Sequence, residues 1–281
     1  MKQAQKKVLT IQDISCVGRC SLTVALPILS AAGMETSVLP TAVLSTHTGG
    51  FTGYTYRDLT VDMLPAVAHW KTLGLGFDAI YTGYLGSFEQ LTLVSEIFDT
   101  FQTADNKIVV DPAMADNGKL YGGFTKEFPN GMAKLCAKAD IIVPNLTEAA
   151  FLLGEEYREH YDKAYIEGLL QRLHALGCGS IVLTGVSFAP HRLGAAVYDG
   201  REIVYAFSDQ MEGTYHGTGD IFASALVGAL LTSGSLTKAA QVATDYTLAC
   251  IQATPASQER RYGVHFETAL PGYMNALGLF P

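Results

Sequence analysis

The sequence is poor in charged residues, and the basic ones are the scarcer kind. Charged side chains make up 16% of the 281 residues, and 19 Lys and Arg stand against 27 Asp and Glu. The formal net charge is therefore −8, with a pI near 5.3. A chain this acidic has no general attraction for the phosphate backbone of DNA or RNA. The composition argues against nucleic acid as a partner.

Long hydrophobic runs are also missing. The most apolar stretch, residues 221–231, is much shorter than the roughly 20 apolar residues that a membrane-spanning helix requires, so we expect a buried helix there. Residues 1–13 include basic side chains but no long apolar core, which favours a short tail leading into a strand over a signal peptide. The five cysteines are scattered and odd in number, which is typical of reduced thiols. Together these features predict a cytoplasmic protein that has no membrane partner.

Three common catalytic signatures do not account for this chain. The motif G-x-x-x-x-G-K-[ST] is absent, which excludes a Walker-type nucleotide site, and the absence of G-x-S-x-G argues against an α/β-hydrolase. Residues 74–79 match the dinucleotide pattern G-x-G-x-x-A, but they precede an apolar run instead of following one. A dehydrogenase is therefore a distant alternative.

Hydrophobic residues make up 48% of the chain, and many gather in short runs that end in a polar residue or glycine. Continuous apolar runs of this kind are typical of strands buried on both faces of a parallel sheet. The predicted strands are Val8–Ile11, Ala79–Tyr81, Ile108–Val110, Ile141–Val143 and Ile181–Leu183.

Segments with the spacing of amphipathic helices lie between these runs, for example around residues 91–98 and 166–173. Residues 194–198 and 202–207, joined across Asp199-Gly200, predict a β-hairpin. The alternation predicts an α/β fold with a mostly parallel central sheet flanked by helices on both faces. We expect a single domain over residues 1–281.

The predicted strands also indicate where a ligand binds. In open α/β sheets, ligands bind beyond the carboxyl ends of the strands. Polar or glycine residues follow the runs at these ends, namely Asp13, Gly83, Asp111, Asn145 and Thr184. We therefore expect these positions to converge on one edge of the sheet.

The most informative segment is Gly213–Asp220, which leads into the apolar run at 221–231. Glycines at 217 and 219 allow backbone N–H groups to approach a ligand, and a helix N-terminus attracts anions, so the segment suits a phosphoryl group in transfer. Asp220, in the first turn, would lie where it can accept a proton from an attacking hydroxyl. By spacing alone, a glycine turn followed by an acidic cap is an equally good interpretation.

With these residues in view, the chain resembles the ribokinase-like superfamily, whose signature the GTGD at 217–220 matches. Further segments resemble pyridoxal kinases, in that family's order along the chain: Ile11-Gln12, Ser45–Thr48, Thr82–Ser87, Val110–Pro112 and Ala139–Glu148. The resemblance implies ATP-dependent phosphorylation of the 5′-hydroxymethyl group of a vitamin B6 vitamer. It also implies Mg²⁺ as a cofactor and a homodimer.

The resemblance implies a role for individual residues of the reaction centre. Asp220 would be the base, and Gly217, Thr218 and Gly219 would form the anion hole. Asp111 and Glu148 would hold Mg²⁺, directly or through water, because carboxylate oxygens suit this cation. Taken singly, each has a simpler interpretation, as an Asp in a turn before proline and as a solvated Glu at a helix start.

Other positions would bind the two substrates. Val143, Asn145 and Thr184 would line the phosphate region of the nucleotide, and Tyr121 would lie in a flap over ATP at residues 114–124, unless that segment is an ordinary surface loop. His47, Thr48 and Tyr84 match the pocket for the B6 ring.

The chain departs from the pyridoxal kinase pattern at Asp13, where that family commonly has serine after the Ile-Gln pair. An anionic Asp13 suits a protonated pyridine nitrogen or the ammonium group of pyridoxamine. The alternative is that Asp13 points away and caps the following turn. A hydroxymethylpyrimidine kinase, which shares the fold and the GTGD signature, and a non-catalytic B6-binding module are the remaining alternatives.

Overall fold

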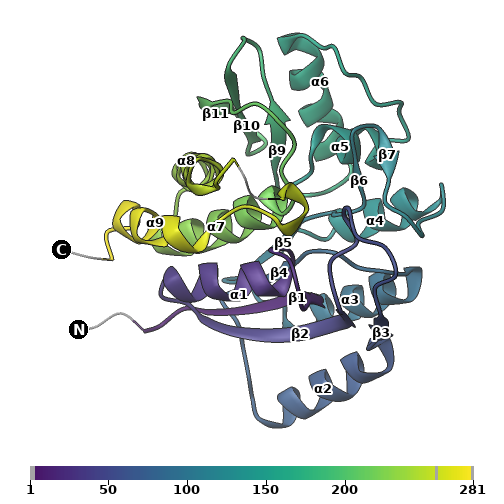
Figure 1. Ribbon diagram of the computed structural model, residues 1–281. Coiled ribbons are helices and arrows are strands. Elements are labelled where there is room, and N and C mark those ends of the chain that lie inside the picture. Colours follow the sequence, from purple (N-terminus) through teal and green to yellow (C-terminus); the bar gives the residue numbers. More distant parts are fainter. Residues whose placement is uncertain (1–3, 257–258, 280–281) are drawn as a thin grey trace.

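The central feature of the protein is a nine-stranded sheet, seen in a computed structural model that describes residues 4–256 and 259–279 (Figure 1). Its strands are β1 (Lys7–Ser15), β2 (Glu35–Leu44), β3 (Tyr56–Asp58), β4 (Ala79–Thr82), β5 (Lys107–Val110), β8 (Ile141–Ile142), β9 (Ser180–Val186), β10 (Arg192–Tyr198) and β11 (Ile203–Asp209). Their order across the sheet is β11–β10–β9–β8–β5–β4–β1–β2–β3.

Most of the sheet is parallel, as the apolar runs predict. The strands from β9 through β8, β5, β4 and β1 to β2 pair in parallel, and β3, β10 and β11 add antiparallel pairs at the two edges. The predicted hairpin is confirmed as β10 and β11, with Val197 opposite Val204. The predicted fold class is therefore correct.

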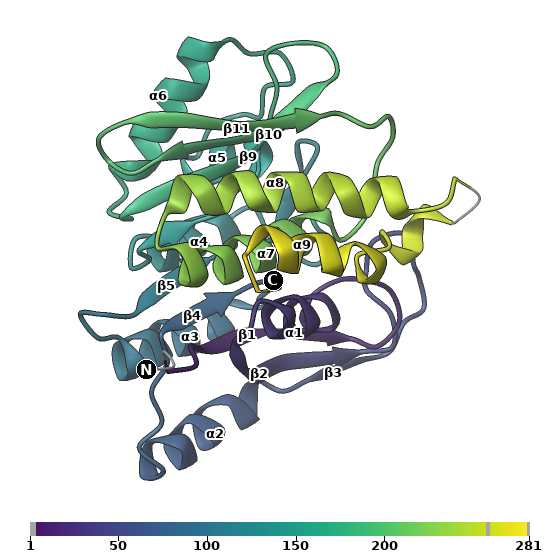
Figure 2. The same cartoon turned by 90° about the vertical axis from the view of Figure 1, so that its left-hand side faces the viewer.

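Helices cover both faces of the sheet. One face carries α1 (Leu22–Ala31), α7 (Thr218–Ser233), α8 (Leu236–Ala253) and α9 (Leu270–Ala276), which lie in front of the sheet in Figure 2. The other carries α2 (Thr60–Thr72), α3 (Phe88–Phe101), α4 (Phe128–Cys136), α5 (Leu146–Leu152) and α6 (Lys163–His174). Strand β4 shows why its run is continuously apolar. Ile80 packs in the core beneath α2–α6, whereas Tyr81 packs in the core beneath α1, α7, α8 and α9.

Strand β2 was not predicted, and Pro40 in its middle explains why. Proline cannot donate to a ladder and therefore argues against an interior strand. In the structure β3 pairs only with Ala42–Leu44 of β2, so Pro40 lies where β2 has β1 on one side and no strand on the other. The β1–β2 register also shifts between Gln12 and Ile14. Because only β1 pairs with β2 at Pro40, a proline that cannot donate to a second neighbour is tolerated there.

The helix expected at 221–231 is α7, and it begins at Thr218 with Gly217 as its N-cap. Residues 221–229 are all buried, as predicted. Asp220 is the acidic residue of the first turn of α7. In the described part of the chain, no helix has both the length and the apolarity to cross a membrane.

The segment predicted as a flap forms a small hairpin of its own, with strands β6 (Ala115–Asp116) and β7 (Lys119–Leu120). Asn117 and Gly118 connect them with φ of 49° and 74°, which is the left-handed backbone that a two-residue primed turn needs. The segment is therefore ordered as a hairpin, with Met114 and Ala115 buried at its base.

Candidate active site

Two adjoining cavities, of about 390 Å³ and about 450 Å³, lie at the carboxyl ends of the parallel strands. The first is lined by nearly all the predicted site residues: Asp13, His47, Thr48, Tyr84, Asp111, Tyr121, Val143, Asn145, Glu148, Thr184, Gly217, Gly219 and Asp220. Thr218 lines the second. Of the predicted strand-end positions, Gly83 alone lines neither, and Asp13 lies within β1, not after its end.

The N-terminus of α7 borders both cavities, because Gly217 and Gly219 line each of them. Gly217 has φ 79°, and a Cβ there would lie 2.0 Å from the carbonyl oxygen of Arg19, so only glycine fits. A Cβ at Gly219 would meet no atom within 4 Å. The first N–H groups of a helix have no partner inside the helix. This turn can therefore present backbone donors to an anion.

Asp220 lies in this first turn, and the backbone N–H of Ser21 donates to its Oδ2 (3.0 Å). Burial raises the pKa of Asp220 to about 6, against the lowering effect of the Ser21 bond, and the charge of Asp13 raises it further. A carboxylate with a pKa near neutrality can accept a proton and later release it. The geometry therefore allows Asp220 to act as a base.

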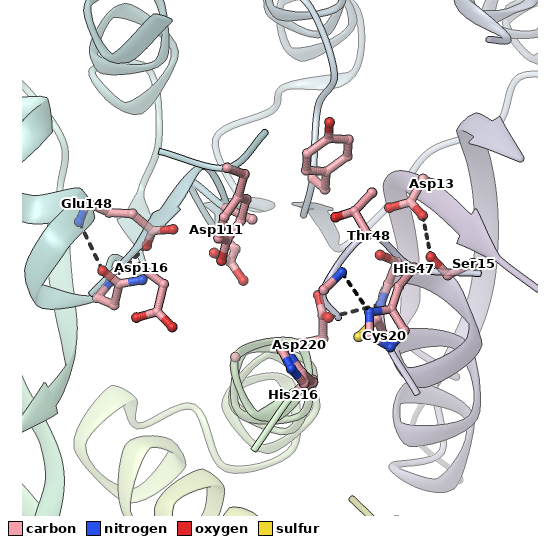
Figure 3. Close-up of a pocket in the computed structure, with 18 of the residues that line it drawn as sticks. Asp13, Ser15, Cys20, His47, Thr48, Asp111, Asp116, Glu148, His216 and Asp220 are labelled. Carbon is pink, nitrogen blue, oxygen red and sulfur yellow. Dashed lines mark hydrogen bonds between the residues drawn. The ribbon is translucent and has the colours of Figure 1, made fainter. Parts of the chain in front are cut away.

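Asp13 and Glu148 lie on opposite sides of the first cavity, with Asp111 and Asp220 between them (Figure 3). Its side chain is 3% exposed, and the hydroxyl of Ser15 donates to Oδ2 (2.9 Å). Burial raises the pKa of Asp13, while hydrogen bonds from Ser21 and Ser15 oppose the rise. Asp13 lines the cavity and thus does not point away from it.

His47 also lines the cavity, but both of its ring nitrogens already have partners in the chain. The N–H of Gly49 donates to Nδ1 (3.1 Å), so Nε2 carries the proton and donates to the carbonyl of Arg261 (2.6 Å). Burial lowers the pKa of His47, which keeps the ring neutral. The ring nitrogens therefore hold the loop at 47–49 against residue 261, and only the carbon edge is left for a ligand.

Asp111 and Glu148 are both buried, at 7% and 2% exposure, so Glu148 is not the solvated residue of the simpler interpretation. Glu148 completes a capping box at the start of α5 with Asn145. Burial raises the pKa of Glu148 to about 8, and burial with the charges of Glu148 and Asp220 raises that of Asp111. Within the described residues, no hydrogen bond reaches the Asp111 carboxylate, which leaves it available to a cation.

Two further residues line both cavities and were not singled out from the sequence, Asp116 and His216. His216 directly precedes Gly217, so adjacency to the glycine motif was a usable signal. Asp116 precedes the Asn117-Gly118 turn, and that dipeptide is a strong sign of a hairpin. The described residues contain no group of three or more His, Cys, Asp or Glu arranged to hold a metal without other ligands.

Comparison with known proteins agrees with this geometry. The family model described as phosphomethylpyrimidine kinase matches residues 26–265. A Bacteroides thetaiotaomicron protein assigned as a phosphomethylpyrimidine kinase, in its crystal form with pyridoxal, is 38% identical with a TM-score of 0.91, over 96% of each chain. Pyridoxal kinase from Lactobacillus plantarum is 32% identical with a TM-score of 0.89, over 97% of this chain and 98% of that one.

A curated relative extends the likeness to pyridoxine kinases. Pyridoxine kinase from Bacillus subtilis is 29% identical over 199 residues, which cover 69% of this chain and 71% of the relative. The resemblance to ribokinase-like pyridoxal kinases is thus confirmed, together with the class of enzyme. The chain belongs to the phosphomethylpyrimidine kinase family and is a ribokinase-like phosphotransferase that uses an alcohol group as acceptor.

Proposed function

We propose that the protein phosphorylates the 5′-hydroxymethyl group of a vitamin B6 vitamer with ATP. The observation that carries this proposal is that two buried carboxylates line one cavity, Asp220 in the glycine turn that opens α7 and Asp13 farther into the cavity, where it would meet the acceptor. The pyridoxal in the Bacteroides relative and the names of the Lactobacillus and Bacillus relatives support the choice of vitamer.

In the proposed reaction, Asp220 accepts the proton of the hydroxymethyl group as its oxygen attacks the γ-phosphorus of ATP. The bond to the β,γ-bridging oxygen breaks, and ADP leaves with that electron pair. The backbone N–H groups of Gly217, Thr218 and Gly219 would hold the transferring phosphoryl group. Val143, Asn145, Thr184 and Tyr121 would lie along the nucleotide phosphates.

The first cavity is lined by five carboxylates, those of Asp13, Asp111, Asp116, Glu148 and Asp220, against one lysine, Lys119. Such a site favours ligands that bring positive charge. Asp111 and Glu148 would hold Mg²⁺, which offsets the charge of ATP and draws electrons from its phosphate oxygens when bound. Asp111 suits this role because its carboxylate has no hydrogen-bond partner in the described chain.

The competing function is hydroxymethylpyrimidine phosphorylation, favoured by the name of the matching family model. One assay separates the two: ADP and phosphorylated product are measured with pyridoxal, pyridoxamine, pyridoxine and hydroxymethylpyrimidine in the presence of Mg²⁺ and ATP. We expect kcat/KM for a B6 vitamer to exceed that for the pyrimidine. A preference for the pyrimidine would reverse the assignment, and no turnover at all would favour a binding module.

We also propose that the enzyme works as a cytoplasmic homodimer, on the strength of the resemblance to pyridoxal kinases. Light scattering coupled to size-exclusion chromatography tests the oligomeric state directly. A mass of 30.1 kDa would correspond to the monomer.

Asp13 provides the sharpest test of the acceptor. A buried carboxylate needs a cationic partner, and a charge-assisted hydrogen bond contributes about 1.5–3 kcal/mol, or about tenfold to hundredfold in preference. We expect Asp13→Ser and Asp13→Asn to lower kcat/KM for pyridoxamine relative to pyridoxal, with KM for ATP unchanged. The Asn variant isolates the charge because its shape is nearly that of Asp.

A second readout comes from the pH profile of the same variants. The charge of Asp13 is one of the causes that raise the pKa of Asp220. Without it, the loss of activity on acidification should occur at lower pH than in the wild-type enzyme. An unchanged vitamer ratio with reduced stability alone would mean that Asp13 serves only to hold Ser15 and the strand end.

The substitution Gly219→Ala tests whether this turn holds the phosphoryl group. An alanine methyl group at this position meets no protein atom and projects into open space, so Gly219→Ala should fold normally and lose activity by crowding the phosphoryl group. Gly217→Ala should instead lower the melting temperature, because its methyl group would overlap the Arg19 carbonyl. Full kcat in a folded Gly219→Ala protein would show that this turn does not hold the phosphoryl group.

A further inference from the structure

The hairpin β6–β7 is too short to hold its position without support. Its strands have two residues each, and even longer isolated hairpins are only marginally stable in water. Yet Asp116 and Tyr121 line both cavities, and Asn117 lines the second. Something outside the hairpin must therefore fix where these side chains lie.

The hairpin is held by hydrogen bonds to side chains at the N-cap and in the first turn of α5. Near the hairpin turn, the N–H of Gly118 donates to the hydroxyl oxygen of Thr147 (3.0 Å). At the hairpin base, the side-chain amide of Asn145 donates to the carbonyl of Ala115 (2.8 Å). These bonds join the start of β6 and the turn that follows it to one helix terminus.

Glu148 adds a third attachment. Its Oε1 accepts from the N–H of Met114 (3.1 Å), the residue before β6, while its Oε2 accepts from the N–H of Asn145 (2.9 Å). Asn145 in turn accepts the N–H groups of Thr147 and Glu148 through Oδ1. The side chains of Asn145 and Glu148 thus cap α5 and also hold the hairpin, which couples the position of the hairpin to that of the helix terminus.

We propose that Thr147 is a positioning residue of the kinase, which with Asn145 and Glu148 fixes the β6–β7 hairpin beside the nucleotide before any ligand binds. The inference rests on the proposed function in one respect, that ATP occupies the space this hairpin borders. Thr147 is the informative member because it is 2% exposed and lines neither cavity. Its hydroxyl accepts the Gly118 N–H of the hairpin, so removing this hydroxyl acts on ATP through the hairpin.

The test compares Thr147→Val, which keeps the shape and removes the acceptor, with Thr147→Ser, which keeps the acceptor. Hydrogen exchange of peptides covering 113–121 is measured on the ligand-free protein, and KM for ATP on the same preparations. One hydrogen bond of ordinary strength corresponds to about fivefold. We expect about fivefold faster hairpin exchange and a similar rise in KM for ATP in the Val variant, with KM for the vitamer unchanged and the Ser variant like wild type.

Unaltered hydrogen exchange in Thr147→Val would show that Thr147 does not fix the hairpin. An equally large increase in exchange in Thr147→Ser would show the same. Faster exchange with an unchanged KM for ATP would overturn the link between hairpin and nucleotide. Thermal melts of both variants confirm that they fold. Exchange is read without substrate, so its result stands whether or not the wild-type protein phosphorylates a vitamer, and failure of the proposed function is recognised separately.

Discussion

Replacing Asp220 by Asn should lower kcat about a hundredfold or more while the protein stays folded and binds both substrates. The amide cannot take the hydroxyl proton, although its oxygen can still accept the N–H of Ser21 that Asp220 accepts now. Steady-state kinetics with the preferred vitamer, together with binding titrations of ATP and vitamer, measure the effect. Near-full kcat in the Asn variant would remove Asp220 from the role of base.

The pH dependence gives an independent check on Asp220. A base works only when ionised, and the pKa of this carboxyl is raised by burial to about 6. In wild type, kcat/KM should therefore fall as pH drops through about 6, whereas an ordinary aspartate would titrate near 4. The residual activity of the Asn variant should lack this limb.

Ionisation of Asp220 affects folding stability in the opposite direction to activity. A carboxyl group whose pKa is raised in the folded state favours folding when protonated, so its ionisation costs stability as pH rises from about 4 to about 6. Asp220→Asn avoids that cost. Its melting temperature at pH 7 should be equal to or higher than that of wild type, which also controls for a trivial loss of fold.

Asp111→Ala should impair the use of MgATP about a hundredfold, with vitamer affinity little affected. A bound metal supplies several kcal/mol of charge stabilisation to phosphoryl transfer, and Asp111 offers it a buried carboxylate that accepts no hydrogen bond in the described chain. Initial rates are measured over a grid of ATP and Mg²⁺ concentrations. Excess Mg²⁺ should restore part of the lost rate.

Glu148→Ala should also weaken the use of MgATP, but it additionally removes the bonds to Met114 and Asn145. Its stability should therefore fall. Asp111→Ala should not show this loss, because burial and the charges of Glu148 and Asp220 raise the pKa of Asp111 and so disfavour its ionised form in the folded protein. A normal KM for ATP and no response to Mg²⁺ in either variant would refute the metal assignment.

The local sequence predicted what depends on local pattern. The five apolar runs correspond to β1, β4, β5, β8 and β9, because a strand buried on both faces must be apolar throughout. Two other local patterns also held: the Asp199-Gly200 turn located the hairpin, and the apolar run at 221–231 located the buried helix after Asp220. The glycines at 217 and 219 indicated the turn that opens α7, because their conformational freedom is a property of the residue itself.

Other features required knowledge of the neighbours. Strand β2 carries Pro40, which is acceptable because β1 alone pairs with β2 at that residue, and periodicity within the chain cannot reveal such an open edge. The Asn117-Gly118 turn was a missed local signal, but its place beside the cavities depends on Thr147, twenty-nine residues further along. His47 matched a ring-binding position, yet its nitrogens bond to Gly49 and Arg261.

By itself, then, the sequence determined the fold class and the edge of the sheet where the cavities lie, and it singled out Asp220 with its glycine turn as a candidate site. Tertiary structure alone decided how each polar side chain is used. The burial that raises the pKa of Asp220, and the shared commitment of Glu148 to a helix cap and a hairpin, arise from residues far apart in the chain. Pattern along a chain reports which residues face inward, whereas charge and hydrogen bonding depend on which partners they meet there.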